Sequence, residues 1–245
     1  MVKKVGLIGC GAIGTVLAEA IDRKLVVCDE LVIYDIAVEQ AIKLKNHLKF
    51  TVTIAPSIDE LLEANPQVIV EAAGQGAVHQ YYEKLAASKA DIIFMSTGAL
   101  LDHDTKNSYL HFPAGAIGGI DAISAAVNAG IDEVVLTSRK SPEALGKNIA
   151  EEEVVYEGYA EEAAKLFPRE MNVAATLALT VKPVKVKVKV VADPAIKRNT
   201  HQIYVKWRFG EMKLEFTNDP HPDNPHTSAL AAWAAIKLLQ TLLGK

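Results

Sequence analysis

The chain has 245 residues, of which 50% are hydrophobic and 23% are charged, with a formal net charge of −4 and a pI near 6.0. This length allows one large domain or two modest ones, and the lack of a basic balance argues against nucleic acid as a partner. The two cysteines, Cys10 and Cys28, cannot form a disulfide framework, and no stretch is typical of a signal peptide or a membrane span. We therefore expect a cytoplasmic protein with no membrane partner.

The first expected element is an apolar strand over residues 2–8, followed by a glycine-rich turn and a helix. The three glycines of this turn have the spacing of a dinucleotide-binding motif. The first permits a tight bend, the second permits close approach of a pyrophosphate, and the third permits close packing of the helix on the strand. The first N–H groups of the helix face the phosphates. The residues of this turn predicted to bind the cofactor are Gly9, Gly11, Ala12, Ile13 and Gly14.

A second expected strand, over residues 30–34, ends at Asp35, about 20 residues beyond the last of these glycines. A carboxylate at this place hydrogen-bonds the adenosine ribose and repels the 2′-phosphate of NADP. No basic side chain follows until Lys43. We therefore predict NAD as the cofactor, while use of NADP as well stays open.

Strands and helices continue to alternate as far as about residue 100. This alternation predicts a doubly wound parallel sheet of the Rossmann type, whose ligands lie beyond the carboxyl ends of the strands. Gly74, Ser96, Thr97 and Gly98 follow two expected strands, so we predict that they border the cofactor, with ordinary turn chemistry as the alternative. The expected strands are 51–54, 67–70 and 91–95, and the expected helices are 38–47, a short one opened by the capping box at 57–60, and 78–87.

The pattern changes beyond about residue 101, where a helix at 121–129, capped by Asp121, precedes a strand at 133–138. Arg139 and Lys140 then form a basic turn, which could hold a carboxylate or could be solvated surface. Two further helices are expected at 160–166 and 171–179. Asn172, near the start of the second, could cap that helix or reach a ligand.

Alternating apolar and polar residues at 184–190, 200–209 and 212–216 predict an antiparallel meander with one buried face. This mainly antiparallel open sheet and its helices define a second, α+β domain over residues 107–218. We assign 1–106 and 219–245 to the Rossmann domain, because the apolar helix expected at 229–243 must be buried. The wet face of an open sheet that carries aromatic side chains often pairs with a second copy, so we expect a homodimer.

His201 lies on the same predicted face as Ile203 and Val205, the covered side of the sheet. A histidine there is either a hydrogen-bonded core residue or a general base beside a ligand. Thr227 and Ser228 precede the last helix, whose N-terminus could bind a substrate carboxylate. The histidines at 218–226 are separated by prolines and match no usual ligand spacing, so no metal is expected.

The combined motifs resemble the L-aspartate dehydrogenase family over nearly the whole chain. The stretches that carry the resemblance are residues 5–14, 96–100, 114–121, 138–142, 167–179, 192–194 with Asn199 and His201, and 224–232. The resemblance implies NAD-dependent oxidation of L-aspartate to iminoaspartate, which hydrolyses to oxaloacetate and ammonia or enters NAD biosynthesis. It also implies that His201 is catalytic, and that Asn172 and either Ala116 or a neighbouring residue lie at the nicotinamide. The candidates for holding the substrate carboxylates are Arg139, Lys140, Asn172, Thr227 and Ser228.

Two other functions are compatible with these residues. A dihydrodipicolinate-reductase-like enzyme joins a similar N-terminal domain to an open sheet, but it predicts a strongly basic substrate loop, and Arg139 with Lys140 is too short to decide this point. A non-catalytic NAD sensor, in which the cofactor biases domain closure, is the alternative from another class.

Overall fold

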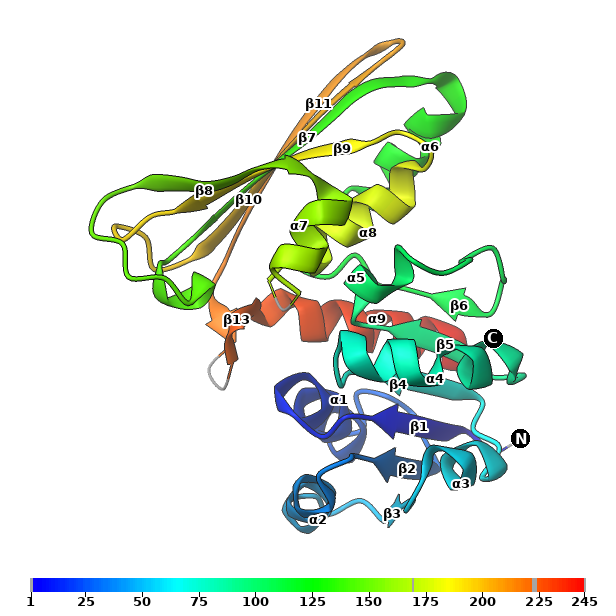
Figure 1. Ribbon diagram of the computed structural model, residues 1–245. Helices are drawn as coiled ribbons and strands as arrows, with labels where there is room; N and C mark the ends of the chain where they lie inside the picture. Colours follow the sequence, from blue (N-terminus) through cyan, green and yellow to red (C-terminus); the bar gives the residue numbers. More distant parts are fainter. Residues whose placement is uncertain (1, 169, 222–223, 245) are drawn as a thin grey trace. The chain divides into compact units, whose positions relative to one another are not determined.

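The computed structural model describes residues 2–168, 170–221 and 224–244, and gives the backbone but not the side chains at 224–227. The chain divides into two units, one of Met1–Pro113 with Ala232–Lys245 and one of Ala114–Ala231. Each unit is built on one main β-sheet, called sheet A in the first unit and sheet B in the second (Figure 1).

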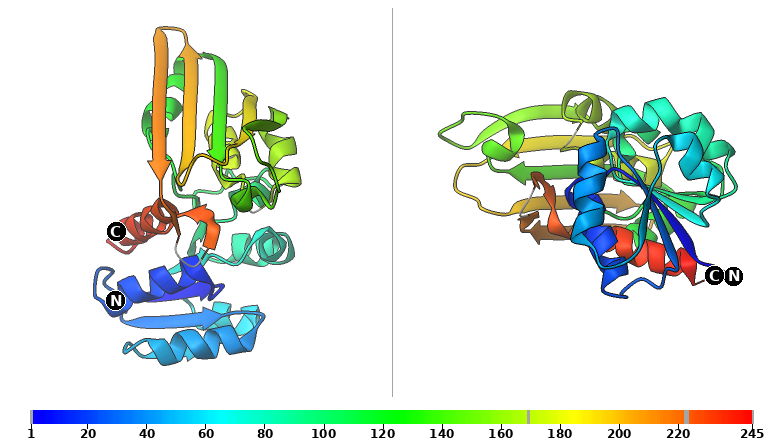
Figure 2. Two further views of the ribbon diagram at one scale, coloured as in Figure 1. Left: turned by 90° about the vertical axis from the view of Figure 1, so that its left-hand side faces the viewer. Right: turned by 90° about the horizontal axis from the view of Figure 1, so that it is seen from below.

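Sheet A has six parallel strands in the order β3-β2-β1-β4-β5-β6. The strand order reverses direction between β1 and β4, which is the arrangement of a Rossmann sheet and confirms the predicted fold class. Its strands are β1 Lys4–Ile8, β2 Glu30–Tyr34, β3 Val52–Ile54, β4 Val68–Glu71, β5 Asp91–Phe94 and the short β6 Leu110–His111. The inner strands β1 and β4 are apolar except for Lys4 at the start of β1 and Glu71 at the end of β4, because helices cover both faces of the sheet (Figure 2).

One helix of the first unit starts as its sequence signal predicts, whereas the helix expected at 78–87 begins earlier, at Gln75. Ser57 caps α3 by accepting a hydrogen bond from the Glu60 N–H at 3.2 Å, as the capping box predicts. Gln240 of the last helix donates to the Leu25 carbonyl at 2.7 Å, which ties the C-terminal segment to this unit. These helices are α1 Ala12–Asp22, α2 Val38–His47, α3 Ile58–Glu63, α4 Gln75–Ala87, α5 Thr97–Leu100 and α9 Ala229–Leu243, which begins in the second unit. Among the described helices, none is long and apolar enough to cross a membrane.

Sheet B has five strands in the order β11-β10-β7-β9-β8, and only β7 and β9 are parallel neighbours. This mixed but mainly antiparallel sheet agrees with the predicted α+β class of the second unit. Its strands are β7 Ile131–Lys140, β8 Glu153–Tyr159, β9 Val186–Ala192, β10 Asn199–Trp207 and β11 Gly210–Asn218. The single-turn helix η1 Glu143–Leu145 follows β7, and a small ladder of β12 Pro220–His221 and β13 Asn224–Ser228 precedes α9.

The expected meander is wrong in one respect, although β10 and β11 do form its hairpin. β9 does not lie beside β10, because β7 lies between them and pairs with both. Alternation fixes which side chains share a face but does not specify neighbouring strands. The alternation at 200–209 also extends too far, since β10 ends at Trp207 and Phe209 lies in the following turn with 70% of its surface exposed.

Helices α6 Ile120–Ala129, α7 Ala160–Leu166 and α8 Asn172–Val181 contact one another and the strands of sheet B, and they cover one of its faces (Figure 1). Within the described residues, no helix covers the other face. Gly119 is the N-cap of α6 and has a left-handed backbone with φ of 71°. Asp121 therefore lies in the first turn, where its charge suits the helix dipole, and is not the cap that the sequence predicts.

Candidate active site

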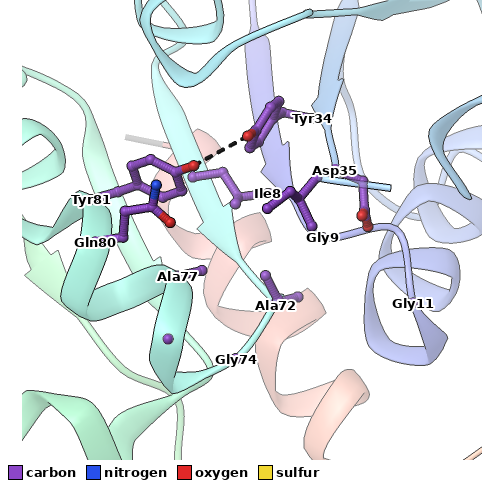
Figure 3. Close-up of a pocket in the computed structure, with 13 residues that line it drawn as sticks. Ile8, Gly9, Gly11, Tyr34, Asp35, Ala72, Gly74, Ala77, Gln80 and Tyr81 are labelled. Atoms are coloured by element: carbon purple, nitrogen blue, oxygen red, sulfur yellow. Dashed lines mark hydrogen bonds between the residues drawn. The ribbon is translucent and has the colours of Figure 1, made fainter. Parts of the chain in front are cut away.

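A cleft of about 500 Å³ lies at the carboxyl ends of β1, β2 and β4 in the first unit (Figure 3). Gly9, Gly11 and Asp35 line it on one side, and Gly74 and Ala77 line it on the other. The cleft lies where the strand order of sheet A reverses, which is the ligand-binding position in sheets of this type.

The glycine-rich turn of this cleft leaves no room for side chains at two positions. Gly9 has a positive φ of 95°, and a Cβ there would lie 2.7 Å from the backbone of Ala72. A Cβ on Gly14 would lie 2.1 Å from the Gly9 carbonyl oxygen, so α1 packs directly on the turn. A Cβ on Gly11 would meet no atom within 4 Å, because the space beside it is open. With Ala12 and Ile13 opening α1, this cradle fits the pyrophosphate of a dinucleotide.

Asp35 is fixed at the end of β2 by hydrogen bonds to both of its carboxylate oxygens. Oδ2 accepts the Cys10 N–H at 2.7 Å and Oδ1 accepts the Ala37 N–H at 2.8 Å. Burial, with the charge of Asp35, raises the pKa of Cys10 to about 12, so its thiol is a filler and not a nucleophile. The hydroxyls of Tyr34 and Tyr81 lie 3.2 Å apart and their rings meet edge to face, which gives the cleft an aromatic wall (Figure 3).

The other predicted cofactor residues of this unit follow β4 and β5. Gly74, with φ of 141°, is the N-cap of α4 and lines the cleft. Ser96 is the N-cap of α5, and Ser96, Thr97 and Gly98 are buried in this neighbouring turn. Both turns are hydrogen-bonded to the side chain of Glu71, a residue that the sequence analysis did not single out.

The second unit gathers buried polar side chains near one end of β7 and β10. We call Ser138, Lys140, Asn199, His201 and Ser228 the His201 cluster; each of them is less than 5% exposed. His201 pairs with Ser138 across the two strands, and Nδ1 of its ring lies 3.0 Å from the Ser138 hydroxyl. Lys140 is two residues from Ser138 and therefore points to the same face of β7. The Asn199 amide donates to the Ser228 hydroxyl at 3.5 Å.

Burial and charge control the protonation of the His201 cluster. Burial, together with the positive charge of Lys140, lowers the pKa of His201 to about 3. Burial also lowers the pKa of Lys140 to about 8, against the attraction of Glu170, whose carbonyl oxygen accepts a hydrogen bond from Nζ at 3.2 Å. At neutral pH the cluster therefore holds a neutral imidazole and a buried ammonium on the same face.

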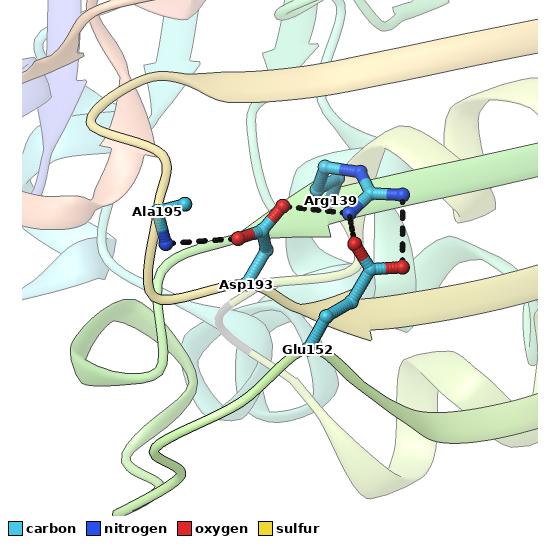
Figure 4. A network of polar contacts seen from close by, with 4 residues as sticks. All are labelled: Arg139, Glu152, Asp193 and Ala195. Atoms are coloured by element: carbon cyan, nitrogen blue, oxygen red, sulfur yellow. Dashed lines mark hydrogen bonds and ion pairs between the residues drawn. The ribbon is translucent and has the colours of Figure 1, made fainter.

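The structure does not bring Arg139 to this cluster. Arg139 points to the opposite face of β7, where its guanidinium binds Asp193 at 2.7 Å and Glu152 at 2.6 Å (Figure 4). The carboxylate of Asp193 also accepts the Ala195 N–H at 2.8 Å, so the network fastens the chain between β9 and β10.

The remaining predicted residues belong to the second unit. Ala116 is buried before α6, and its carbonyl oxygen accepts a hydrogen bond from the Asn218 amide at 2.9 Å. Asn172 is the half-buried first residue of α8, with Met171 at the N-cap position. The side chain of Thr227 lies outside the described part of the chain.

Ser138, Asn199 and Glu71 were not among the predicted site residues. Ser138 lies within the strand expected at 133–138, and extending that strand to Lys140, as β7 does, places Ser138 and Lys140 on one buried face. Glu71 had a weaker signal, an acidic residue directly after an apolar strand.

The comparisons with known proteins agree across both units. The model described as homoserine dehydrogenase, NAD binding domain, matches residues 9–114, and the model described as aspartate dehydrogenase, C-terminal, matches residues 121–242. The L-aspartate dehydrogenase of Archaeoglobus fulgidus is 39% identical over 97% of each chain, and that of Methanosarcina barkeri is 37% identical over 98% of this chain and 97% of the relative. The crystal structure of aspartate dehydrogenase from Thermotoga maritima matches with a TM-score of 0.77 and 28% identity, covering 99% of this chain and 97% of that one. The chain therefore belongs to the L-aspartate dehydrogenase family.

Proposed function

We propose that this chain catalyses the NAD-dependent oxidation of L-aspartate to iminoaspartate, with His201 as the base. The observation that carries the assignment of the base is the hydrogen-bonded His201 cluster, in which burial and a neighbouring ammonium keep a histidine neutral. Family membership supplies the substrate, and the glycine-lined cleft with Asp35 fits the cofactor.

The mechanism starts from the amino group of the substrate, which must be neutral before it can be oxidised. NAD, when bound, accepts the hydride that leaves the α-carbon. His201 takes the amino proton at Nε2, while its Nδ1–H donates to the Ser138 hydroxyl. After Nε2 has released this proton to bulk water, the neutral ring takes a proton from the water that attacks the protonated imine. The same ring then returns a proton to the nitrogen, which leaves as ammonia and gives oxaloacetate.

Lys140 binds one carboxylate of L-aspartate, and Ser228 and Asn199 supply neutral hydrogen-bonding groups nearby. The negative charge of the substrate offsets the positive charge of Lys140. Because opposite charge favours the protonated form of an imidazole, substrate binding moves the pKa of His201 back toward its ordinary range. The substrate thereby makes His201 a stronger base when a proton is to be accepted.

Asp35 sets a preference for NAD over NADP. Its carboxylate is held in the cleft by two backbone N–H groups and would repel a 2′-phosphate. Replacement of Asp35 by Ser should therefore lower the ratio of kcat/KM with NAD to kcat/KM with NADP by about tenfold or more. An unchanged ratio would contradict this role.

We also propose that two copies pair through the face of sheet B that no described helix covers. This face carries a hollow of about 370 Å³, whose lining includes polar, charged and aromatic groups, a mixture that suits a second copy. Among its lining residues are Thr137, Gln202, Tyr204, Lys213 and Glu215. Sedimentation of the full chain at micromolar concentration should show a dimer, and Tyr204→Glu should weaken it. We place the enzyme in the cytoplasm, where free thiols such as Cys10 and Cys28 stay reduced.

The assignment of the base is tested by His201→Ala. We expect kcat for aspartate oxidation to fall by about two orders of magnitude or more, the usual contribution of a general base. The dissociation constant for NAD, measured by calorimetry, should stay within about twofold, because His201 lies in the other unit from the cleft. His47→Ala, which removes an exposed histidine of α2 that lines neither the cleft nor the hollow of sheet B, is the matched control. Unchanged turnover in His201→Ala would remove His201 from the mechanism.

A further inference from the structure

Glu71 has a carboxylate side chain and 0% of its surface is exposed. It plays no part in the mechanism proposed above. It is the last residue of β4, at the carboxyl edge of sheet A. Burying such a group is costly unless it is well hydrogen-bonded, so its contacts call for an explanation.

Both oxygens of Glu71 accept hydrogen bonds, and the donors come from two different turns. Oε1 accepts the N–H groups of Ala73 and Gly74, each at 2.9 Å, in the turn that follows its own strand. Oε2 accepts the N–H of Ser96 at 3.0 Å, and Oε1 also accepts the Ser96 hydroxyl at 3.0 Å, in the turn that follows β5. One side chain therefore fastens the two strand-to-helix turns to each other.

The helices that follow the two turns also lie close together at Gly98, where a Cβ would lie 2.0 Å from the side-chain nitrogen Nε2 of Gln75. Ala73 and Gly74 line the cleft, whereas Glu71 itself does not. In a Rossmann sheet, the first three strands bind the adenosine half of the dinucleotide, and the strands on the other side of the reversal bind the nicotinamide half. The turns held by Glu71 belong to this second group, after β4 and β5.

We propose that Glu71 is a positioning residue for the pyrophosphate and nicotinamide half of NAD, which acts by holding the Ala73–Gly74 turn and the Ser96 turn at a fixed separation. It does not touch the cofactor, so its effect passes through the backbone of these two turns. The proposal rests on the use of NAD proposed above.

The sharpest test is Glu71→Gln, which keeps the shape of the side chain but turns one oxygen into an NH₂ group. In either orientation of the amide, one of the two turns then faces a donor instead of an acceptor. We expect the dissociation constant for NAD, measured by calorimetry, to rise about tenfold, the cost of one lost hydrogen bond to a buried group. The dissociation constant for AMP, which contains only the adenosine half, should change by less than about twofold, since Asp35 and Tyr34 are untouched.

The ratio of the two dissociation constants separates positioning from general support of the fold, because loss of stability alone would not favour one ligand. In hydrogen exchange, the backbone amide of Ser96 or of Gly74 should exchange about tenfold faster in Glu71→Gln than in wild type. Glu63→Gln, an exposed change at the end of α3, should alter neither the ratio nor the exchange.

Each result decides one of the two proposals. If wild-type protein fails to bind NAD, the proposed function fails and the role of Glu71 falls with it. If wild-type protein binds NAD and Glu71→Gln leaves the NAD:AMP ratio within about twofold, only the role of Glu71 is overturned. If Glu71→Gln does not fold, Ser96→Ala decides instead, because it removes only the hydroxyl contact. That variant should raise the ratio about threefold, and an unchanged ratio would overturn the proposal.

Discussion

The two units place buried ionisable groups at the ends of their strands, but they surround these groups in opposite ways. Burial favours the neutral form of Glu71 in the first unit and of Lys140 and His201 in the second, since it raises the pKa of the carboxyl and lowers those of the two bases. Around Glu71, N–H and O–H donors oppose this effect. Beside His201, the charge of Lys140 adds to it.

This difference distinguishes Glu71, whose partners all belong to the protein, from Lys140 and His201, whose charges are better balanced when a ligand is bound. The donors around Glu71 are part of the protein, so its contacts are complete in the free chain. In the His201 cluster, two basic groups oppose each other's protonation, and a bound dicarboxylate stabilises the cluster because negative charge favours both protonated forms. Changes at Glu71 should therefore loosen the two turns that it holds even without a ligand, whereas changes in the His201 cluster should weaken substrate binding more than the fold.

Lys140→Met should give the largest effect and tests this contrast directly. Loss of the ammonium should raise KM for aspartate about a hundredfold, because a buried carboxylate loses its charged partner. The same change replaces a buried charge with an apolar side chain of similar length, so the free energy of unfolding in urea should stay equal or increase by about 1 kcal/mol or more. A normal KM would remove Lys140 from substrate binding, and a large loss of stability would show that the lysine is a structural group.

The pH dependence of stability should be the next largest effect, because it depends on the pKa of His201. In the unfolded chain His201 takes up a proton below pH 6.5, but in the folded chain it does so only near pH 3. Between these values the unfolded state binds more protons, so stability falls as the pH falls. From pH 7.5 to pH 5, the wild type should lose about 2 kcal/mol more than His201→Gln, which does not titrate. If stability changed with pH by the same amount in the two proteins, His201 would have the same pKa in the folded and unfolded states, and the burial effect on His201 would be contradicted.

Ser138→Ala should have a smaller effect, confined to turnover. The hydroxyl is the partner of His201 Nδ1 and fixes the orientation of the ring, so its loss should reduce kcat about tenfold. KM for aspartate should change little, because Lys140 remains in place. Ser138→Thr keeps a hydroxyl and should retain more of kcat than Ser138→Ala does. An unchanged kcat in Ser138→Ala would contradict the orienting role.

The first unit could be predicted well from the sequence because its signals are local. The glycines at 9–14 and Asp35 belong to one strand-helix-strand unit, and the structure places Gly9, Gly11 and Asp35 on the same cleft. The fold class followed from alternating strands and helices. The contacts of Glu71 could not be predicted from local sequence signals, because they join β4 to the turn after β5, 25 residues further along the chain.

The second unit was harder to predict because its site depends on strand pairing. His201 and Ser138 are 63 residues apart and meet only because β10 pairs with β7, a neighbour that alternation does not specify. The predicted strand also ended at residue 138, two residues before β7 ends at Lys140. With the strand ended at 138, Arg139 and Lys140 fall in one basic turn and both become candidates for binding the substrate. In the longer strand β7, consecutive side chains point to opposite faces, so only one of the two can lie beside His201.

Arg139→Met is the matched partner of Lys140→Met and should give the smallest effect. Its guanidinium is 31% exposed and bound to Glu152 and Asp193, so water screens the ion pairs, and their loss should lower the free energy of unfolding by about 1 kcal/mol or less. KM for aspartate should rise by no more than about threefold, because the side chain lies on the face of β7 away from His201. If Arg139→Met raised KM as much as Lys140→Met, the position of a side chain on one face of β7 would not decide whether it binds the substrate. The substrate would then have to reach both faces of the strand.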